Sequence, residues 1–536
     1  MAPEQRDEFD VVVVGSGFGG AMVAHELAGR MRVLVLERGR PYPPGSFPRS
    51  PRAFARDGLW APQGSRHGLW EVLSFRGLDA IVSSGLGGGS LIYANVLLEK
   101  DPDTFAADGM VIEPDVLREH AQAARRLLRG VRYPWAESTP KTRAVLDAAG
   151  ELGLPAELPP IAVAFGRRPG DPLSGDNLHG VARRTCTLSG ACFVGCNEGA
   201  KQTLDLTLLT AAERAGAAIR TCSEARTLRR EDDGWVVGIR QHVAARAGHP
   251  ERVLDPDPSP WREVRARRVV LAAGTFGTTR LLLANRAALP GLSRRLGAGF
   301  SSNGDLLMFL RGADRFLDPS RGPTITATIR VPDAQSPSGR ELLVQDAGSP
   351  AGGEWLWQLL TETPGDLWRL RGRIARRLAA RGRGGADSRV GELIASALGD
   401  THASAAMVPL LGMGRDVPDG RMTLDGDALC LSWRERPSRS FFEGLEATGR
   451  RVGAALGGRV FRLGGRFARL VTVHPLGGCA MARDAEHGVV GSDGEVFGAH
   501  GLYVADGSLL AGPVGPNPSL TISALARHVA HGLRDG

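Results

Sequence analysis

An α/β fold with more than one domain is predicted by three features of the sequence. The chain has 536 residues, which is too long for a single hydrophobic core. Residues 9–39 follow the order buried strand, glycine-rich turn, helix, buried strand, which is typical of a parallel sheet covered by helices. Residues 219–230 and 234–241 alternate apolar and polar side chains, so they predict neighbouring antiparallel strands.

The composition is that of an ordinary globular protein. Hydrophobic residues make up 42% of the chain and charged residues 23%. The formal charge is +8, but the arginines are spread along the chain, so no nucleic-acid partner is expected. No apolar run approaches the roughly 18 residues that span a bilayer. The N-terminus lacks the pattern of a signal peptide, so a cytoplasmic protein is expected.

One Arg-rich segment stands out against this even distribution. Residues 367–385 place Leu370, Ile374 and Leu378 on one helical face, with arginines over most of the remaining surface. Such a helix either lies in solvent or makes peripheral contact with a membrane surface.

The first glycine-rich turn has the spacing of a dinucleotide-binding loop. Gly15, Gly17 and Gly20 form G-x-G-x-x-G, in which the first glycine turns the chain. The second lets backbone amides approach a pyrophosphate, and the third lets helix and sheet pack closely. The helix N-terminus then faces the phosphates. Glu37 ends the second strand, where a carboxylate can accept hydrogen bonds from ribose hydroxyls.

Two further segments indicate which dinucleotide is bound. Residues 83–95, "SSGLGGGSLIYAN", hold a second glycine cluster, which implies backbone packed against a flat or charged group. Residues 265–286 again run strand, small-residue turn and helix, with space at Ala272, Ala273 and Gly274 for a bulky group. Together the three segments favour flavin adenine dinucleotide (FAD) over a nicotinamide cofactor.

A set of motifs in fixed order identifies a family. They are "VVVGSGFGG" with "LVLERG", "GLGGGSLIYANV", "GCNEGAKQTL", "VVLAAGTFGTTRLLL", "SSNGD", "LLGMGRDVPDGRMTL", "HPLGG" and "LYVADGSLLAGPVGPNPSLTISALA". With these motifs spread over almost the whole chain, the sequence resembles the glucose–methanol–choline (GMC) oxidoreductases. Within that family it is most similar to bacterial cholesterol oxidases and their relatives.

The resemblance implies how the chain is divided. A Rossmann-like FAD-binding domain would be assembled from residues 1–100, 180–305 and 466–536. An interleaved substrate domain, built on an antiparallel sheet, would comprise residues 306–465. Residues 101–179 would add a lid segment to the substrate domain.

The resemblance also assigns the catalytic residues. In "VTVHPLGGCA" (471–480) a strand runs into His474 and the chain then turns sharply at Pro475 and the glycines. His474 matches the family's active-site histidine, and Asn517 matches its second position, where cholesterol oxidases carry Asn. An imidazole can take the hydroxyl proton while the flavin takes hydride from the same alcohol. Asn517 offers both a donor and an acceptor to position that hydroxyl.

The cofactor-binding residues follow from the same motifs. Asp506 is expected by the ribityl and pyrophosphate groups, and the helix that opens at Pro518 and Ser519 is expected to point its positive end at the flavin. No histidine lies near residues 87–95, so FAD is expected to be non-covalent. The full predicted set is Gly15, Ser16, Gly17, Phe18, Gly19, Gly20, Glu37, Arg38, Gly87, Gly88, Gly89, Ser90, Asn95, Ala225, Gly274, Asp506, Gly507, Pro518 and Ser519.

Three closely spaced cysteines leave two alternatives open. Cys186, Cys192 and Cys196 have the spacing C-x5-C-x3-C, and one branch of the family carries a three-iron [3Fe-4S] cluster on similar cysteines. Otherwise they are packed thiols or include a disulfide. His528 and His531 share one face of the last helix, but no third ligand suggests metal, so they are expected to face solvent.

The predicted activity is oxidation of an alcohol CH–OH group, with a hydrophobic secondary alcohol, sterol-like or cyclic, as substrate. Electrons would pass to O2 or to an external acceptor. One alternative is a dehydrogenase that reduces a protein or quinone, with the three-iron cluster as relay. Another is a lyase that keeps FAD and uses His474 without net redox chemistry. Asp346 is a candidate for a carboxylate in the substrate pocket; the other interpretation is a surface turn.

Overall fold

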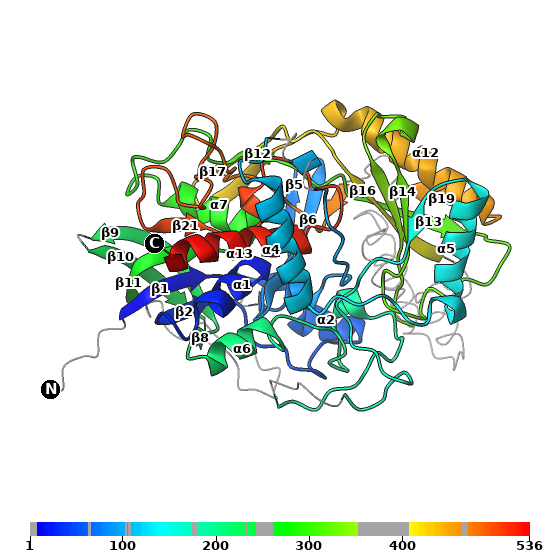
Figure 1. The fold of residues 1–536 in the computed structure, drawn as a ribbon, viewed down its shortest axis with the longest axis horizontal. Coiled ribbons are helices and arrows are strands. Elements are labelled where there is room, and N and C mark those ends of the chain that lie inside the picture. Colours follow the sequence, from blue (N-terminus) through cyan, green and yellow to red (C-terminus); the bar gives the residue numbers. More distant parts are fainter. Residues whose placement is uncertain are drawn as a thin grey trace, which may run out of the picture.

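The computed structural model describes residues 8–62, 66–101, 104–105, 109–173, 180–231, 233–242, 261–351, 407–462 and 470–535. Two large sheets organise this part of the chain, one on each side of Figure 1. The predicted Arg-rich segment 367–385 lies outside the described residues. Within them, no helix has the length and apolar character required to cross a membrane.

The first sheet has seven strands among the described residues and contains the predicted N-terminal unit. Its order is β8-β2-β1-β11-β10-β9, and β21 pairs in parallel with the end of β11. β1 lies parallel to β2 and β11, and β9, β10 and β11 form an antiparallel meander. The bounds are β1 Glu8–Val14, β2 Val33–Leu36, β8 Ala218–Arg220, β9 Ser223–Glu231, β10 Gly234–Gln241, β11 Trp261–Leu271 and β21 Leu502–Val504.

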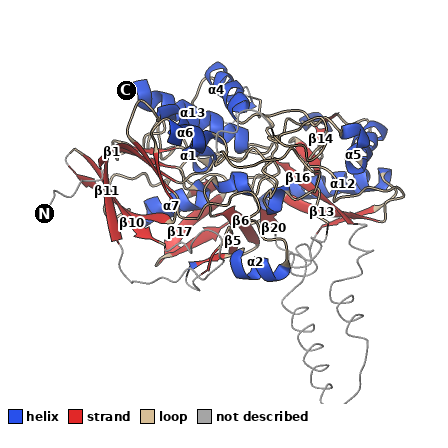
Figure 2. Cartoon of the chain, turned by 90° about the horizontal axis from the view of Figure 1, so that it is seen from below, coloured by secondary structure: helices blue, strands red, loops and turns tan. Residues whose placement is uncertain are grey.

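Helices cover this sheet because its central strands are apolar on both faces. Val11, Val12 and Val13 are fully buried. Helices α1, α6 and α13 gather on one side of the strands (Figure 2), and α4 packs on α13. The bounds are α1 Phe18–Leu27, α4 Pro114–Leu127, α6 Leu208–Arg214, α7 Gly274–Ala284 and α13 Ser519–Asp535.

The second sheet is antiparallel, as predicted, and has the order β19-β13-β16-β15-β14-β7. Helices α5 and α12 pack on one of its faces. Since side chains alternate along a strand, Leu342 and Val344 face these helices and Gln345 faces the opposite side. The bounds are β7 Ala156–Glu157, β13 Leu306–Arg311, β14 Thr328–Val331, β15 Leu342–Asp346, β16 Met407–Gly414, β19 Arg459–Arg462, α5 Pro140–Glu151 and α12 Arg439–Ala455.

Three smaller sheets complete the described part of the fold. One joins β20, which leads to His474, in parallel to β6, and β6 to β5. The five-segment division of the chain into domains stays a prediction. The remaining elements are α2 Pro51–Asp57, β3 Trp60–Ala61, β4 Arg66–His67, β5 Trp70–Phe75, β6 Leu78–Ser83, β12 Ala298–Phe300, β17 Gly420–Asp425, β18 Ala428–Ser432 and β20 Leu470–Thr472.

Candidate active site

The His474 imidazole is held by a buried carboxylate that the sequence-based prediction missed. Its Nδ1 lies 2.8 Å from Oδ1 of Asp305, whose side chain is fully buried. The second oxygen of Asp305 accepts hydrogen bonds from the backbone N–H groups of Val473 and His474 and from the Thr472 hydroxyl. Because a carboxylate oxygen accepts hydrogen bonds, Nδ1 of His474 is the donor in this contact and Nε2 is left as an acceptor.

The turn after His474 is tied to two elements of the predicted flavin-binding region. The carbonyl of Pro475 accepts a hydrogen bond of 2.7 Å from the hydroxyl of Thr275, in the first turn of α7. The backbone then runs alongside residues 507–509, with Gly477 N–H bonded to the Gly507 carbonyl and Cys479 N–H to the Ser508 carbonyl. His474 therefore lies close in the fold to Gly274 and Asp506.

Asn517 is positioned through Asn303, which lies two residues before Asp305. The Asn303 carboxamide is fully buried, and its Oδ1 accepts from the backbone N–H groups of Val514 and Gly515. Its Nδ2 donates to the carbonyls of Gly515 and Pro516. The motif "SSNGD" (301–305) therefore holds two parts of the site. Asn303 holds the loop that leads to Asn517, and Asp305 holds the imidazole of His474.

The same segment is held from its other side by Asp416. This fully buried carboxylate accepts hydrogen bonds from the hydroxyls of Ser301 and Ser302 and from the Ser302 N–H. Burial raises the pKa of Asp416 to about 6, and the hydrogen bonds oppose that shift only in part. Neither Asp416 nor Asn303 was predicted, since only their tertiary partners reveal a role.

The Asn517 side chain itself is hydrogen-bonded to Gln345 of β15. Nε2 of Gln345 lies 2.9 Å from Oδ1 of Asn517 and 3.0 Å from Oγ1 of Thr328. Both Gln345 and Asn517 are buried, at 0% and 5% exposed. The face of the antiparallel sheet that is free of α5 and α12 therefore borders Asn517.

The predicted glycine clusters meet in space. A Cβ on Gly88 would lie 2.6 Å from the Cα of Gly17, and the hydroxyl of Ser16 accepts a hydrogen bond from the Gly87 N–H. A Cβ on Gly15 would lie 2.3 Å from the carbonyl oxygen of Ala272. By contrast, a Cβ on Gly17 or Gly274 would meet nothing within 4 Å. Open space therefore borders both helix N-termini, α1 and α7.

A buried polar side chain without partners is a second observation that fits a bound FAD. The Asn95 side chain is fully buried, yet neither its oxygen nor its nitrogen has a hydrogen-bond partner among the described residues. A buried carboxamide without partners is costly, and a bound polar ligand would satisfy it. Next to it, the Ser519 hydroxyl at the start of α13 donates to the Val96 carbonyl. The described residues thus offer glycine-lined space and an unsatisfied polar group where the motifs predict the cofactor.

Several predicted cofactor residues also hold the loops together. Asp506 accepts from the Gly274 N–H and the Thr278 hydroxyl through one oxygen, and from Ser508 through the other. Burial raises the pKa of Asp506. A Cβ on Gly19 would overlap the Ala505 carbonyl, so α1 packs directly on the loop before Asp506. Ser90 bonds the Gly87 carbonyl and the Leu204 N–H.

The strand-end residues Glu37 and Arg38 have protein partners of their own. Glu37 accepts from the N–H and hydroxyl of Ser16 and from the Gly39 N–H, and burial raises the pKa of Glu37. Arg38 pairs with Glu71 and stacks over Trp60. Phe18 contacts Tyr93 edge to face at 5.1 Å, and Ala225 lies on β9, which pairs with β10. Hydrogen bonds to a ribose stay a prediction for Glu37.

The three-iron cluster gains no support from the described residues. They contain no group of three His, Cys, Asp or Glu side chains able to hold a metal ion, although Cys186, Cys192 and Cys196 are all described. All three are free thiols, so no disulfide joins them.

Two other expectations are wrong. Asp346 is fully buried in an ion pair with Lys141 of α5, because it points to the helix-covered face of the sheet and not to Asn517. His531 and His528 do not face solvent freely: the ring of His120 on α4 packs 5.1 and 5.3 Å from them, and His531 bonds Glu26. The packing of α4 on α13 covers them, which the helical spacing alone did not reveal.

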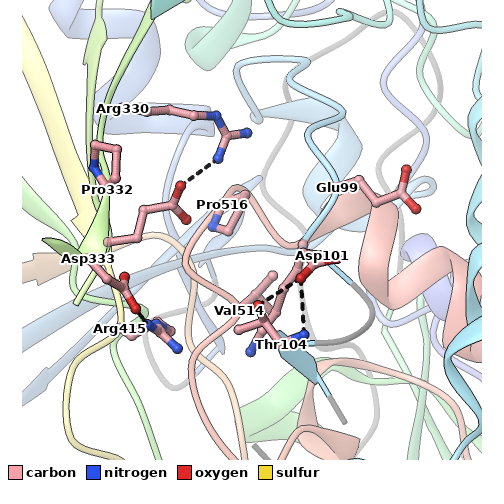
Figure 3. A pocket seen from close by; sticks show the side chains of 11 residues that line it. Glu99, Asp101, Thr104, Arg330, Pro332, Asp333, Arg415, Val514 and Pro516 are labelled. Carbon is pink, nitrogen blue, oxygen red and sulfur yellow. Dashed lines mark hydrogen bonds and ion pairs between the residues drawn. The ribbon is translucent and has the colours of Figure 1, made fainter. Parts of the chain in front are cut away.

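A polar cleft of about 470 Å³ opens beside the loop that leads to Asn517 (Figure 3). Among its lining residues, Arg330 pairs with Glu341 and Arg415 with Asp333. These charged side chains pair with one another and make the cleft polar. It is therefore not the pocket expected for an apolar alcohol.

Comparisons with known proteins show which family the chain belongs to. A family described as "FAD dependent oxidoreductase" matches residues 10–298, and one described as "GMC oxidoreductase" matches residues 464–526. A cholesterol oxidase of Mycobacterium tuberculosis is 31% identical over 98% of this chain and 91% of its own. A cholesterol oxidase of Acinetobacter baumannii is 27% identical over 97% of this chain and 93% of its own.

A solved structure supports the fold. The pyridoxine 4-oxidase of Mesorbium loti superposes with a TM-score of 0.61 at 17% identity, covering 98% of this chain and 99% of that one. At this identity the likeness concerns the fold alone. It supports the predicted α/β architecture, and the sequence matches confirm the predicted family. The chain belongs to the GMC oxidoreductases and is an FAD-dependent oxidoreductase that acts on CH–OH donors.

Proposed function

We propose that the protein oxidises a hydrophobic secondary alcohol, sterol-like or cyclic, with His474 as the base that removes the hydroxyl proton. The observation that carries this proposal is the hydrogen bond between His474 Nδ1 and the Asp305 carboxylate. It leaves Nε2 as the proton acceptor, and the carboxylate stabilises the imidazolium that forms when the proton arrives. A base placed in this way typically contributes about 10²- to 10⁴-fold to a rate.

When bound, FAD supplies the acceptor for the hydride that leaves the carbinol carbon. The predicted residues around the glycine loops, Asn95 and Asp506 would hold it. Asn517 would position the hydroxyl, because its carboxamide is buried and Asn303 anchors the loop before it to the segment that orients His474. No part of this scheme requires the three-iron cluster, and the described residues give no ground for proposing one.

An apolar substrate is favoured by the sheet face that borders Asn517. Gln345 pairs in register with Leu411 of β16, and Leu307 of β13 lies opposite Leu411. Leu307 and Leu411 are half-buried on this face. The relatives named cholesterol oxidase point to the same substrate class. O2 is the proposed final electron acceptor, since these relatives are oxidases.

Anaerobic spectra of the purified protein test the proposal. A panel of sterols, cyclic secondary alcohols, sugars and short primary alcohols is added, and loss of the visible absorption of oxidised flavin is recorded. We expect bleaching by sterols or cyclic secondary alcohols and recovery with peroxide when air is admitted. Bleaching only by other alcohols would overturn the substrate class. Turnover while the flavin stays oxidised would favour the lyase, and recovery only with an added protein or quinone acceptor would favour the dehydrogenase.

A further inference from the structure

Gln345 makes an unusual set of contacts for a residue in the middle of a sheet. It is fully buried in β15, and its side-chain nitrogen uses both hydrogens, toward Asn517 Oδ1 at 2.9 Å and Thr328 Oγ1 at 3.0 Å. Its own Oε1 is buried without a partner among the described residues. An unsatisfied buried carbonyl destabilises the folded state. A leucine, such as the neighbouring Leu343, would avoid that cost, so stability does not explain Gln345.

The bond to Asn517 determines which way the Asn517 carboxamide faces. Oδ1 accepts from Gln345, so the NH2 group, on the other arm of the planar carboxamide, points away from Gln345. No hydrogen bond of that nitrogen is found within the part of the chain that the structure describes. The Asn303 contacts, by contrast, reach only the backbone of residues 514–516 and leave the side-chain rotation of Asn517 open.

The direction of this amide matters for alcohol oxidation. As the hydroxyl loses its proton to His474, negative charge develops on the alcohol oxygen. An N–H donor stabilises that charge, whereas a carbonyl oxygen in the same place would repel it. We infer that Gln345 is a positioning residue of the reaction: it holds the Asn517 carboxamide so that the NH2 group, and not the oxygen, is presented to the substrate. This inference rests on the proposed function.

The variant Gln345→Glu tests it with almost no change of shape. An ionised glutamate only accepts hydrogen bonds, so it cannot hold Asn517 Oδ1. We expect kcat for flavin reduction to fall about 10- to 100-fold, with KM changed less than about threefold, because the lost interaction is made to the transition state. A protonated glutamate regains one donor. Lowering the pH should therefore restore the activity of this variant relative to the wild type.

Two controls separate this role from a general effect on the fold. Gln345→Leu cannot donate at any pH, so it should lose kcat similarly but show no recovery in acid. In an Asn517→Ala background, Gln345→Glu should lower kcat no further. Should the glutamate variant fail to bind FAD, Gln345→Met in the wild-type and Asn517→Ala backgrounds repeats the comparison without a charge.

The outcomes are distinct. Wild-type kcat in Gln345→Glu at neutral pH would overturn the inference. So would a loss of kcat that persists in the Asn517→Ala background or that fails to recover in acid. If no alcohol bleaches the flavin of the wild-type protein, the proposed function fails instead, before any variant is compared.

Discussion

The carboxylate of Asp305 does two things for His474: Oδ1 holds the ring nitrogen Nδ1 at 2.8 Å, and Oδ2 holds its backbone N–H at 3.1 Å. The imidazole is thus fixed in tautomer and in direction by one fully buried side chain. The partner lies 169 residues away in the chain. Removal of this one charge should therefore affect the base more than the fold.

The variant Asp305→Asn should lower kcat for flavin reduction by about 10²- to 10⁴-fold, similar to the loss of the base itself. An asparagine would donate its N–H to Nδ1, which moves the ring proton to Nε2 and removes the proton acceptor. Rapid-mixing spectra of flavin reduction give the rate. The control is Asp147→Asn on α5, where the carboxylate is 47% exposed and pairs with Arg315 at the surface. Equal rates for Asp305→Asn and the wild type would contradict the role of Asp305.

A second prediction concerns the space beside Gly17. Because a Cβ there meets no protein atom within 4 Å, Gly17→Ala should fold with an unchanged Tm in the FAD-free state. The methyl group would occupy the space in which a pyrophosphate must approach the backbone, so FAD affinity should fall at least about tenfold. Gly150→Ala in α5, also free of contacts within 4 Å, is the matched control and should keep its FAD. Titration of FAD into stripped protein, followed by flavin fluorescence, measures both.

These two sites show what the sequence could and could not predict. The glycine loops were predictable because a dinucleotide constrains backbone geometry over a few adjacent residues, and short motifs record such constraints. Gln345 and Asp305 were not, since their roles depend on partners 172 and 169 residues distant. The motif "SSNGD" contributed to the family resemblance, but the motif alone does not show that Asn303 and Asp305 form hydrogen bonds with two different loops.

The error at Asp346 has a related cause. It follows Gln345 directly, and in a strand adjacent residues point to opposite faces. The sheet was predicted, but its register against Asn517 was not, so the sequence could not tell which of the two side chains borders the site. Likewise, the i,i+3 spacing of His528 and His531 correctly places them on one helical face but does not show that α4 covers that face.

Asp416 predicts a pH dependence of stability. Its folded pKa of about 6 exceeds the ordinary value of 3.8, so folding favours the protonated form. The stabilisation is fully present below pH 3.8 and is lost as the pH rises through about 6. Asp416→Asn keeps an acceptor for Ser302 and cannot ionise. We expect it to match the wild type in acid and to exceed its free energy of unfolding by about 2–3 kcal/mol above pH 7.

Urea unfolding of both proteins between pH 4 and 8 measures this difference. A constant gap between the two curves at all pH values would mean that the charge of Asp416 is not what separates them. A wild type that is more stable than the variant at pH 8 would reverse the sign and contradict the prediction.

His120 predicts the opposite trend on another face of the molecule. Its ring projects from α4 and packs against α13, where Nδ1 accepts a hydrogen bond from Arg527 at 2.9 Å. Burial, followed by the nearby charges of His528, Arg527 and His531, lowers the pKa of His120 to about 4, while Glu26 opposes the shift. The unfolded chain takes up a proton near pH 6.5, but the folded protein does so only near pH 4. Stability therefore falls as the pH drops from about 6.5 towards 4.

The variant His120→Gln can still accept from Arg527 but does not titrate. Its free energy of unfolding should equal that of the wild type at pH 7.5. Between pH 7 and pH 4.5 it should fall by about 1 kcal/mol less than in the wild type, a value reduced for solvent screening. Thermal unfolding across this range gives the comparison, and His487→Gln, at a histidine that is 74% exposed, serves as the control. Parallel curves of unfolding free energy against pH for His120→Gln and the wild type would contradict the prediction, because protonation of His120 would then have no effect on stability.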